Sequence, residues 1–377
     1  MTRRFRHGLV VGKFLPPHAG HDLLIDAAAA ACERVSVVVA GPDGGPVPLV
    51  RRAAWLAASH AAQPGVVVLA AVDDHPVDYD SPAVWDAHMA VFETAVARGA
   101  VLAGLEPAAA VVDAVFSSEP YGAELARRLG AANVCVDHGR VRRPCSGTAV
   151  RADVIGHWDD LAPSVRAGLA LRVVFVGAES TGTTTVSQGV AEALRARGGT
   201  WAATAWVGEY GRDYTLGRLA VAAAQAQAAG RPPPGMGALV WTPEDFLAIA
   251  ERQVALEDAA TAGGSPVLVC DTDAFATGIW HERYLGGRHS GVEAIGDARS
   301  HPLYLLTDHV GVPFVQDGIR DGEAIRSWMT GRFAEALTSS GRNWRRLTGP
   351  LDERVAVAVA AIDDQCGDAW RFEAEPG

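Results

Sequence analysis

The chain has 377 residues, of which 49% are hydrophobic, so it is long and apolar enough to form two domains rather than one. Its net charge of −11 argues against a nucleic-acid partner, because proteins that bind nucleic acids usually carry a basic surface. The five cysteines include no C-x-x-C pair, and no charge-free apolar run reaches the roughly 18 residues of a membrane span, so we expect a reduced, cytoplasmic protein without a zinc site and without a membrane partner.

The first half of the chain alternates short buried strands with helices. Strands are predicted at 8–12, 35–40, 66–71, 111–116 and 133–136, and helices at 21–32, 51–62, 82–98 and 121–129. This alternation predicts a parallel sheet with helices on both faces. The segment 148–168 is predicted to be helical with breaks.

The same pattern starts again at residue 172. Strands are predicted at 172–176, 204–207, 266–270 and 303–307, helices at 183–196, 242–261, 321–338 and 351–363, a loop at 230–237 and a frayed end over the last dozen residues. The fold class is therefore α/β, with two doubly wound parallel-sheet domains. We place their boundary so that the domains are 1–168 and 169–377.

The segment GKFLPPHAGH, residues 12–21, directly follows the first strand, where ligands bind in folds of this kind. Lys13 is the only lysine of the chain, which suggests that its compact charge is needed there. His18 and His21 flank two small residues, and we expect His21 to open the next helix, where free N–H groups attract phosphate. Taken alone, a pair of histidines with this spacing has an alternative interpretation, namely two surface histidines beside a turn.

With Phe14 and Pro16 at set positions, this segment resembles the nucleotidyltransferase superfamily signature G-x-F-x-P-x-H-x-G-H. The resemblance implies a Rossmann-like domain that transfers an adenylyl group from ATP with the help of Mg²⁺. It also implies a second phosphate-binding element, S-[ST]-x-x-R, which matches residues 146–151 except that Gly147 stands where family members often have serine. The residues implied to be catalytic are Lys13, His18, His21 and Arg151, and those implied to bind ATP are Gly12, Phe14, Ser118, Ser146 and Thr148.

The acceptor of the adenylyl group is indicated by Trp85, which lies near Asp80 in the segment 75–89. If Trp85 stacks on a cationic nicotinamide ring, the complex gains a cation–π interaction. The alternative is that Trp85 is simply one large residue of the hydrophobic core. Together with residues 115–131, this segment resembles the nicotinamide-mononucleotide adenylyltransferase half of the bifunctional NadR-type proteins. The resemblance implies that Trp85 and Asp80 bind nicotinamide and that Ser117, Ser118 and Glu119 lie near the adenosine.

The segment GAESTGTTT, residues 177–185, has the outline of the phosphate-binding loop G-x-x-x-x-G-K-[ST]. It follows the apolar run 173–176 and precedes a predicted helix, which is the expected context. The position of the usual lysine is occupied by Thr183, which can donate a hydrogen bond but carries no charge. The predicted loop residues are Gly177, Ser180, Gly182, Thr183, Thr184 and Thr185.

Four later segments resemble the ribosylnicotinamide kinase half of NadR-type proteins: 207–214, 241–253, 268–286 and 315–322. Some members also carry a DNA-binding helix-turn-helix at the N-terminus, and we expect no such element ahead of the motif at residues 12–21. The resemblance implies that Thr184 and Asp271 hold Mg²⁺ and that 315–322 forms a lid. The other candidate kinase residues are Glu209, Arg212, Asp273 and Arg320.

The threonine at position 183 leaves three interpretations open. Arg212 or Arg320 supplies the missing charge, the kinase is slow or inactive, or the domain acts on a different nucleoside. For the whole chain we predict adenylyl transfer to nicotinamide mononucleotide, with nicotinamide riboside as the second substrate and a homo-oligomer as a possible assembly. The alternatives are transfer to another phosphorylated acceptor, and a second domain that senses nucleotides without turnover.

Overall fold

The computed structural model describes residues 4–106, 110–299, 301–370 and 372. It divides into two compact units, one that extends to Gly168 and one formed by Leu169–Ala369. The first unit also includes Trp370, whose ring centroid lies 6.1 Å from that of Trp158. Part of the predicted frayed end, at 371 and 373–377, lies outside the described residues.

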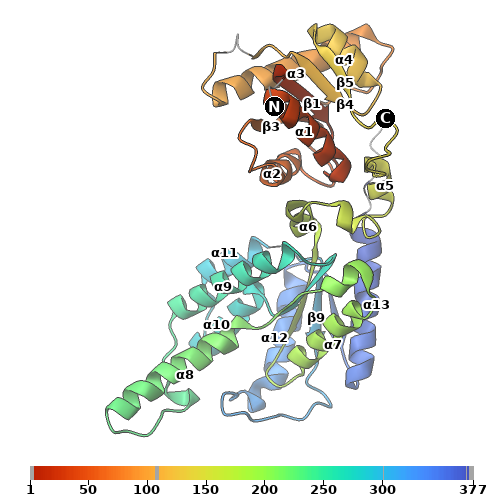
Figure 1. Ribbon diagram of the computed structural model, residues 1–377. Coiled ribbons are helices and arrows are strands. Elements are labelled where there is room, and N and C mark those ends of the chain that lie inside the picture. The colour runs from red at the N-terminus through yellow and green to blue at the C-terminus, as the bar shows by residue number, and fades with distance from the viewer. Residues whose placement is uncertain (1–3, 107–109, 300, 371, 373–377) are drawn as a thin grey trace. The chain divides into compact units, whose positions relative to one another are not determined.

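The first unit is a five-stranded parallel sheet in the order β3-β2-β1-β4-β5 (Figure 1). Its strands are β1 (Phe5–Gly12), β2 (Cys32–Gly41), β3 (Val66–Val72), β4 (Ala114–Ser117) and β5 (Ala132–Cys135). Its helices are α1 (Ala19–Ala31), α2 (Leu49–Ser59), α3 (Pro82–Leu102), α4 (Tyr121–Leu129), α5 (Gly147–Ala152) and α6 (Pro163–Leu169), with a 3₁₀ turn η2 at Trp158–Asp160.

Both faces of this sheet are buried, because alternate residues of the central strands pack in opposite directions. Leu9 and Val11 of β1 join a core with α3 and α4. Val10 joins a second core with α1 and α2. The first unit is therefore doubly wound, and the carboxyl end of β1 at Gly12 lies in the middle of the sheet.

The second unit is also a five-stranded parallel sheet, in the order β10-β9-β6-β8-β7. Its strands are β6 (Leu171–Gly177), β7 (Trp206–Val207), β8 (Val267–Asp271), β9 (Leu303–Thr307) and β10 (Trp344–Leu347). Its α-helices are α7 (Thr183–Arg195), α8 (Tyr210–Ala228), α9 (Pro243–Thr261), α10 (Ala274–Leu285), α11 (Ser290–Asp297), α12 (Arg326–Ser339) and α13 (Leu351–Ala369). Three 3₁₀ turns complete it: η3 (Gly199–Ala203), η4 (Met236–Ala238) and η5 (Glu323–Ile325).

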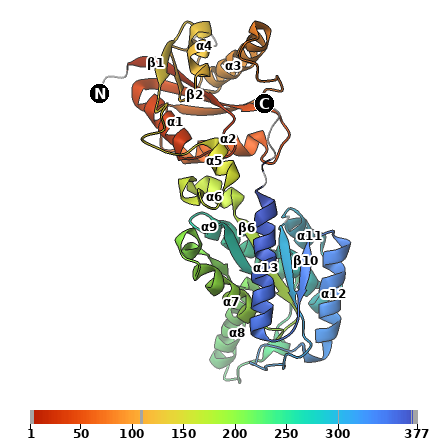
Figure 2. The same ribbon diagram turned by 90° about the vertical axis from the view of Figure 1, so that its right-hand side faces the viewer.

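The register of the central strand β6 positions the residues at its carboxyl end. Phe175 pairs with Asp271 of β8, and Gly177 pairs with Thr307 of β9. Val174 and Val176 pack in a core with α10 and α12, while α7 and α13 contact each other and β6 (Figure 2). The predicted fold class, an α/β protein with two doubly wound parallel sheets, is confirmed.

Four elements of the second unit were not predicted from the sequence. They are the helices α8, α10 and α11 and the edge strand β10. Helix α8 is rich in alanine and mostly exposed, so it has little apolar periodicity, and β10 (WRRL) is a short strand with two exposed arginines at its centre. The last helix was predicted too short, because α13 continues through residue 369.

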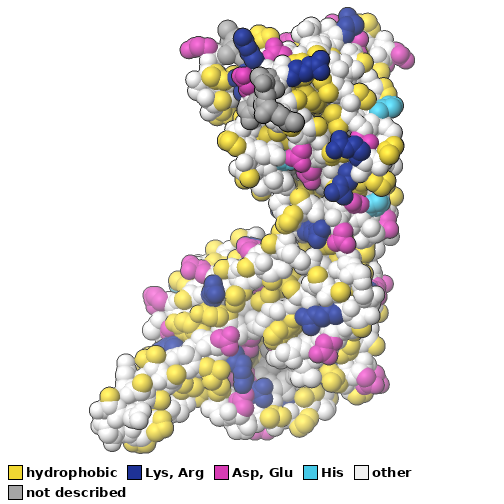
Figure 3. All heavy atoms as spheres, viewed as in Figure 1, with side chains coloured by type: hydrophobic (Ala, Val, Ile, Leu, Met, Phe, Trp, Pro, Cys, Tyr) yellow, Lys and Arg dark blue, Asp and Glu magenta, His cyan; other side chains and the backbone are white. Residues whose placement is uncertain are grey.

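Among the residues that the structure describes, no helix combines the length and the apolar character needed to cross a bilayer. On the face drawn in Figure 3, the described acidic and basic side chains are interspersed over both units.

Candidate functional site

The carboxyl end of β1 opens into a cavity of about 560 Å³ in the first unit. Gly12 and Lys13 reach it from β1, and Tyr121 reaches it from α4. The remaining wall comes from β2, from the segment after β3, and from α3. The polar and aromatic residues of this wall include Lys13, Asp73, Asp74, Asp78, Tyr79, Trp85 and His88.

The backbone of Lys13 is held by a buried arginine that the sequence analysis did not single out. Arg52 of α2 is 1% exposed, and its Nη1 donates a 2.6 Å hydrogen bond to the carbonyl oxygen of Lys13. The Lys13 residue itself is exposed at the cavity. A fixed backbone with an accessible ammonium group suits the binding of a phosphate.

Trp85 lines this cavity, as expected of a residue that contacts a ligand, but it is only 5% exposed, as expected of a core residue. Its indole N–H donates to the carbonyl oxygen of Tyr79 at 3.1 Å, and the Arg128 guanidinium carbon lies 5.4 Å from its ring centroid. The placement of Asp80 is corrected, because this residue is exposed and is not part of the cavity wall. Its backbone N–H instead donates to Asp78, which does line the cavity.

A carboxylate–histidine pair faces the same cavity and was missed in the sequence. Asp73 is buried at the end of β3, and its Oδ2 lies 2.6 Å from Nδ1 of His88 on α3. Nε2 of His88 lies 3.1 Å from the carbonyl oxygen of Pro76. The two residues are 15 positions apart and lie on either side of the loop between β3 and α3, a spacing that matches no recognised motif.

His18 and His21 stack at the start of α1, with ring centroids 3.7 Å apart. His18 is the N-cap of the helix and His21 its third residue, so the helix begins two residues before the predicted start and His21 lies in its first turn. The Gly20 N–H donates to Nδ1 of His18 at 3.1 Å, and the His18 N–H donates to Nδ1 of His21 at 3.3 Å. Since each Nδ1 accepts a hydrogen bond from a backbone N–H group, each neutral ring carries its own hydrogen on Nε2.

Both histidines are neutral near pH 7. Burial lowers the pKa of His18 to about 4, and burial and the neighbouring His18 lower the pKa of His21 well below its ordinary value. The guanidinium groups of Arg151 and Arg140 lower both pKa values further. Nε2 of His18 is buried and has no hydrogen-bond partner among the described residues, which is costly unless a ligand accepts from it.

The predicted second phosphate element lies beside this histidine pair. The Ser146 hydroxyl caps α5 by accepting from the Ala149 N–H at 3.1 Å. Arg151 donates from Nη1 to the Leu15 carbonyl oxygen at 3.0 Å and from Nη2 to the Thr148 hydroxyl at 3.4 Å. A Cβ built on Gly147 would lie 3.8 Å from Nε2 of His18, so the two motifs meet at this point.

Phe14 connects the histidines to the cavity. Its ring lies 4.7 Å from that of His21, and a Cβ built on Gly12 would lie 3.2 Å from it. Ser118 is placed at the same edge of the sheet but is absent from the cavity wall, and its carbonyl oxygen lies 3.1 Å from Nδ1 of His138. Neighbouring Glu119 pairs with Arg140, the arginine whose charge acts on both histidines.

The carboxyl end of β6 opens into a second cavity, of about 450 Å³, in the second unit. All of the predicted loop residues line it, from Gly177 through Thr185. Glu209, Arg212, Asp271 and Arg320 line it as well, and aromatic side chains from α9 and α10 complete the wall. The structure therefore brings all the kinase candidates to one cavity, with the exception of Asp273.

Thr183 directs its hydroxyl into a cluster of threonines. Its Oγ1 lies 2.9 Å from Oγ1 of Thr307, which lies 2.7 Å from Oγ1 of Thr181. A Cβ on Gly177 would lie 2.3 Å from the Thr307 hydroxyl, so the cluster requires glycine there. The hydroxyl at position 183 thus has partners within the protein and supplies no charge to the cavity.

Thr184 and Asp271 form the other polar pair of this cavity. The Thr184 hydroxyl donates a 2.6 Å hydrogen bond to Oδ2 of Asp271. Burial raises the pKa of Asp271 to about 6, and the bond from Thr184 partly offsets this rise. Burial and then the negative charge of Asp271 raise the pKa of Glu209 to about 7.

The candidate role of Asp273 at the cavity is wrong, because its side chain faces the interior of the unit. Oδ1 accepts from the Ala276 N–H and so caps α10 at 2.8 Å. Oδ2 accepts from the Tyr304 hydroxyl at 2.7 Å. Asp273 is 1% exposed and stabilises the helix start rather than a ligand.

The predicted lid segment 315–322 is attached to the phosphate loop at both ends. The Val315 N–H donates to the Ser180 hydroxyl at 2.8 Å, and the Gly322 N–H donates to Glu179 at 2.7 Å. Between these points, Asp317 accepts from Arg212 of α8 at 2.6 Å. These bonds hold Arg320, which lines the cavity, over the loop.

Known proteins resemble this chain in sequence over most of its length. A family model described as an AAA domain matches residues 172–354. The trifunctional NAD biosynthesis/regulator protein NadR of Escherichia coli (strain K12) is 25% identical over an alignment of 326 residues, and the alignment covers 83% of this chain and 71% of that protein. The protein of the same name from Salmonella typhimurium (strain LT2) matches with the same identity and coverage.

Solved structures of NadR proteins share the fold of both units. A NadR protein in complex with NR superposes with a TM-score of 0.68 at 19% identity, over 99% of each chain. A NadR protein in complex with NAD and AMP-PNP superposes with a TM-score of 0.66 at 16% identity, over 100% of this chain and 99% of the other. This chain is a NadR-like protein.

Two buried arginines of this NadR-like chain donate hydrogen bonds to backbone carbonyl oxygens of the phosphate loop. Neither arginine was identified from the sequence. Arg326 of α12 donates to the Ser180 carbonyl oxygen at 2.9 Å. Arg354 of α13 donates to the Thr181 carbonyl oxygen at 3.0 Å. Their partners lie 146 and 173 residues away, and no local pattern signals such contacts.

Strained backbone marks the loops of both candidate sites in the NadR-like fold. Among the described residues, the non-glycine residues with positive φ are Phe14, Asp137, Arg140, Ser180 and Thr272. The left-handed region is costly for such residues and persists where the surrounding structure imposes it, which is common at ligand sites. Phe14 and Ser180 belong to the two motifs that the sequence itself identified.

Proposed function

We propose that the first unit transfers the adenylyl group of ATP to nicotinamide mononucleotide, forming NAD and pyrophosphate. The observation that carries this proposal is the buried Nε2 of His18, which has no partner among the described residues and lies beside Arg151. A neutral N–H donor beside an arginine is suited to an oxygen of a phosphate group. The NadR protein that binds NAD and AMP-PNP supports this choice of nucleotides.

In this proposal, a phosphate oxygen of the mononucleotide attacks the α-phosphorus of ATP. The new P–O bond forms as the bond to the leaving pyrophosphate breaks, so no covalent enzyme intermediate is needed. The Nε2–H groups of His18 and His21 and the ammonium of Lys13 stabilise the charge that develops around the α-phosphate. Thr148 and Arg151 hold the pyrophosphate, and Mg²⁺ bound to the nucleotide neutralises its charge when present.

The acceptor is proposed to bind in the cavity that contains Lys13. Lys13 lines this cavity together with Asp73, Asp74 and Asp78. A positive group for the phosphate and carboxylates for a cationic pyridine ring match the two ends of nicotinamide mononucleotide. The aromatic surface of Tyr79 and Trp85 would contact the ring.

We further propose that the second unit binds ATP and nicotinamide riboside as a kinase-like domain. Thr184 and Asp271 offer the hard oxygen ligands that Mg²⁺ prefers, and they are already within hydrogen-bond distance. When bound, Mg²⁺ would neutralise charge on the β- and γ-phosphates. Arg320 takes the position of the missing positive charge, and Glu209 accepts the proton of the attacking hydroxyl.

Adenylyl transfer is tested with the purified chain, Mg-ATP and nicotinamide mononucleotide. We expect NAD and pyrophosphate to form in equal amounts. A panel of other phosphorylated acceptors forms the comparison, since transfer to one of them is the alternative reaction. Turnover of another acceptor without formation of NAD would overturn the proposed substrate while retaining the proposed chemistry.

The internal hydrogen bonds of Thr183 favour a second candidate for the second unit, a nucleotide sensor without turnover. Calorimetry with ATP and a kinase assay with nicotinamide riboside separate the two candidates on the intact chain. Formation of ADP and nicotinamide mononucleotide supports the kinase. ATP binding at the second unit, abolished by Asp271→Ala, with no ADP formed supports the sensor.

A further inference from the structure

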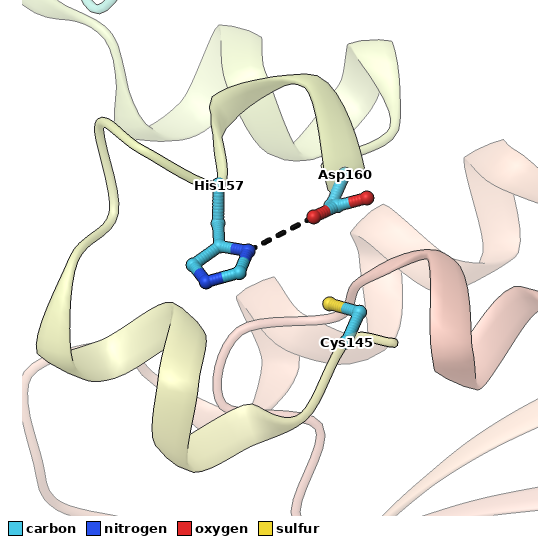
Figure 4. Close-up of side chains that lie close together, drawn as sticks. All are labelled: Cys145, His157 and Asp160. Carbon is cyan, nitrogen blue, oxygen red and sulfur yellow. Dashed lines mark hydrogen bonds and ion pairs between the residues drawn. The ribbon is translucent and has the colours of Figure 1, made fainter. Parts of the chain in front are cut away.

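Three side chains of metal-binding type meet in the first unit: Cys145, His157 and Asp160 (Figure 4). Each offers one ligand atom, and these three atoms all lie within 4.8 Å of one another. Nδ1 of His157 lies 2.9 Å from Oδ2 of Asp160. Figure 4 shows the Cys145 sulfur directed into the space between the His157 ring and the Asp160 carboxylate.

The fold fixes the spacing of these side chains. Cys145 lies in the loop before α5, whereas His157 and Asp160 lie at the start and end of η2. Trp158, between the two, is 1% exposed and anchors η2 in the interior of the unit. The three ligand atoms are therefore held by two separately anchored segments rather than by one flexible loop.

The three ligand types match zinc rather than magnesium or calcium. Zn²⁺ binds thiolate, imidazole nitrogen and carboxylate oxygen, while Mg²⁺ and Ca²⁺ take oxygen ligands. Cys145 is 4% exposed, but the side chains of His157 and Asp160 are 26% and 32% exposed. One side of the cluster is thus open to solvent, so a water molecule can complete a tetrahedral site.

We propose that Cys145, His157 and Asp160 bind a divalent ion of the zinc class. Binding converts the Cys145 thiol to a thiolate and releases its proton to solvent. Nδ1 of His157 exchanges its contact with Asp160 for a bond to the ion, and the hydrogen that Nδ1 shared with Asp160 is given up to solvent, with the ring keeping a hydrogen on Nε2. The thiolate and the carboxylate together balance the two positive charges. The sequence predicted no zinc site, because a single cysteine with a distant histidine and aspartate forms no recognisable spacing.

The ion would tie the loop that precedes Ser146 to η2. Cys145 is directly followed by the element that contains Ser146 and Arg151, so binding would restrain that element from its amino-terminal side. Because the ligands meet only in the folded chain, the ion stabilises the native state. This inference depends on the geometry of the cluster and not on the proposed reaction.

The direct test is a titration of the intact, metal-stripped and nucleotide-free chain with Co²⁺, followed by displacement with Zn²⁺. We expect one equivalent to bind and to produce the charge-transfer absorption of a cobalt–thiolate bond, which Zn²⁺ abolishes. Cys145→Ser is expected to lose this absorption. His157→Ala and Asp160→Asn are expected to bind Co²⁺ at least about tenfold more weakly, since even changes around a metal ligand cost that much.

Cys135→Ser is the matched control, because Cys135 is exposed and ends β5 in the same unit. It is expected to bind as the unsubstituted chain does. In a second readout, Zn²⁺ should raise the Tm of the unsubstituted chain and of Cys135→Ser but not that of Cys145→Ser.

The proposal is overturned if the unsubstituted chain shows no cobalt–thiolate absorption, or if the absorption persists in Cys145→Ser. If Cys145→Ser does not fold, the partly exposed His157 and Asp160 carry the test. Unchanged Co²⁺ affinity in both His157→Ala and Asp160→Asn would then reject the site.

Discussion

Both units place a turn of small residues at the carboxyl end of their central strand, but they supply positive charge to it differently. At the turn after β1, Lys13 is part of the motif itself and lines the cavity. At the loop after β6, the matching residue is Thr183, which bonds to Thr307, and the cavity receives Arg212 and Arg320 from other segments. The first cavity therefore receives a positive charge from its own motif, whereas the second receives its positive charges from α8 and the lid.

Because of this difference, the two sites should respond differently to amino-acid substitutions. A cavity that receives its charge from its own motif should lose function when that charged residue is replaced. A site whose charge comes from a lid should depend on the contacts that attach the lid, such as those of Glu179 and Ser180.

The largest effect is expected for Lys13→Ala and His21→Ala. Each should lower NAD formation by about two orders of magnitude or more, because each removes a group that stabilises the developing charge. Steady-state rates with Mg-ATP and nicotinamide mononucleotide measure this. Lys13→Arg tests whether a compact charge is required, and turnover close to that of the unsubstituted chain in Lys13→Ala would reject the assignment.

The next effect is expected for Arg320→Ala in the second unit. If the lid arginine replaces the usual lysine, ADP formation with nicotinamide riboside should fall by about tenfold to a hundredfold. Arg231→Ala is the control, because Arg231 is exposed and is not part of the cavity wall. Equal rates in both variants would mean that the second site does not draw its charge from the lid.

A pH effect follows from the pKa of Glu209, which burial and Asp271 raise to about 7. Only the ionised carboxylate can accept a proton, so the kinase rate should fall by about tenfold for each pH unit below about 7. Because the folded-state pKa lies above the ordinary 4.5, the protonated form stabilises the fold, and this contribution is lost as the pH rises through about 7.

Glu209→Gln checks both parts of this prediction. Chemical unfolding at several pH values should show the variant gaining stability relative to the unsubstituted chain as the pH rises, and the kinase rate of the variant should be low at every pH. A kinase rate in Glu209→Gln that still falls below pH 7 would place the titrating group elsewhere.

The smallest effect is expected for Thr183→Lys. Restoring the usual charge should raise ADP formation severalfold, up to about tenfold, because Arg320 already supplies part of it. Thr183→Val is the control, since it removes the bond to Thr307 without adding charge and should cost about 1 kcal/mol of stability. An unchanged rate in a folded Thr183→Lys chain would favour the sensor over the kinase.

Much of the architecture was predictable because the central strands are continuous apolar runs followed by small residues. The β1–α1 turn, the β6–α7 loop and the meeting of His18 with residues 146–151 all agree with the motifs in the sequence. The missing elements were those without apolar periodicity, such as α8. Local pattern also misplaced Asp80 and Asp273, because it cannot show in which direction a side chain points.

The remaining parts of both sites depend on contacts between distant residues. Thr183 and Thr307 are 124 residues apart, and Arg354 reaches the phosphate loop across 173 residues. Arg52 is buried in a helix and reads as an ordinary surface residue until the fold places it under Lys13. Such contacts follow from packing, for which one sequence offers no direct signal.

The most direct test measures both half-reactions on one preparation of the intact chain, with and without Lys13→Ala. We predict that the unsubstituted chain forms NAD and pyrophosphate from ATP and nicotinamide mononucleotide. We predict that Lys13→Ala abolishes this reaction and leaves nucleotide binding at the second unit unchanged. Absence of NAD formation by the unsubstituted chain, or retention of it by Lys13→Ala, would contradict the account.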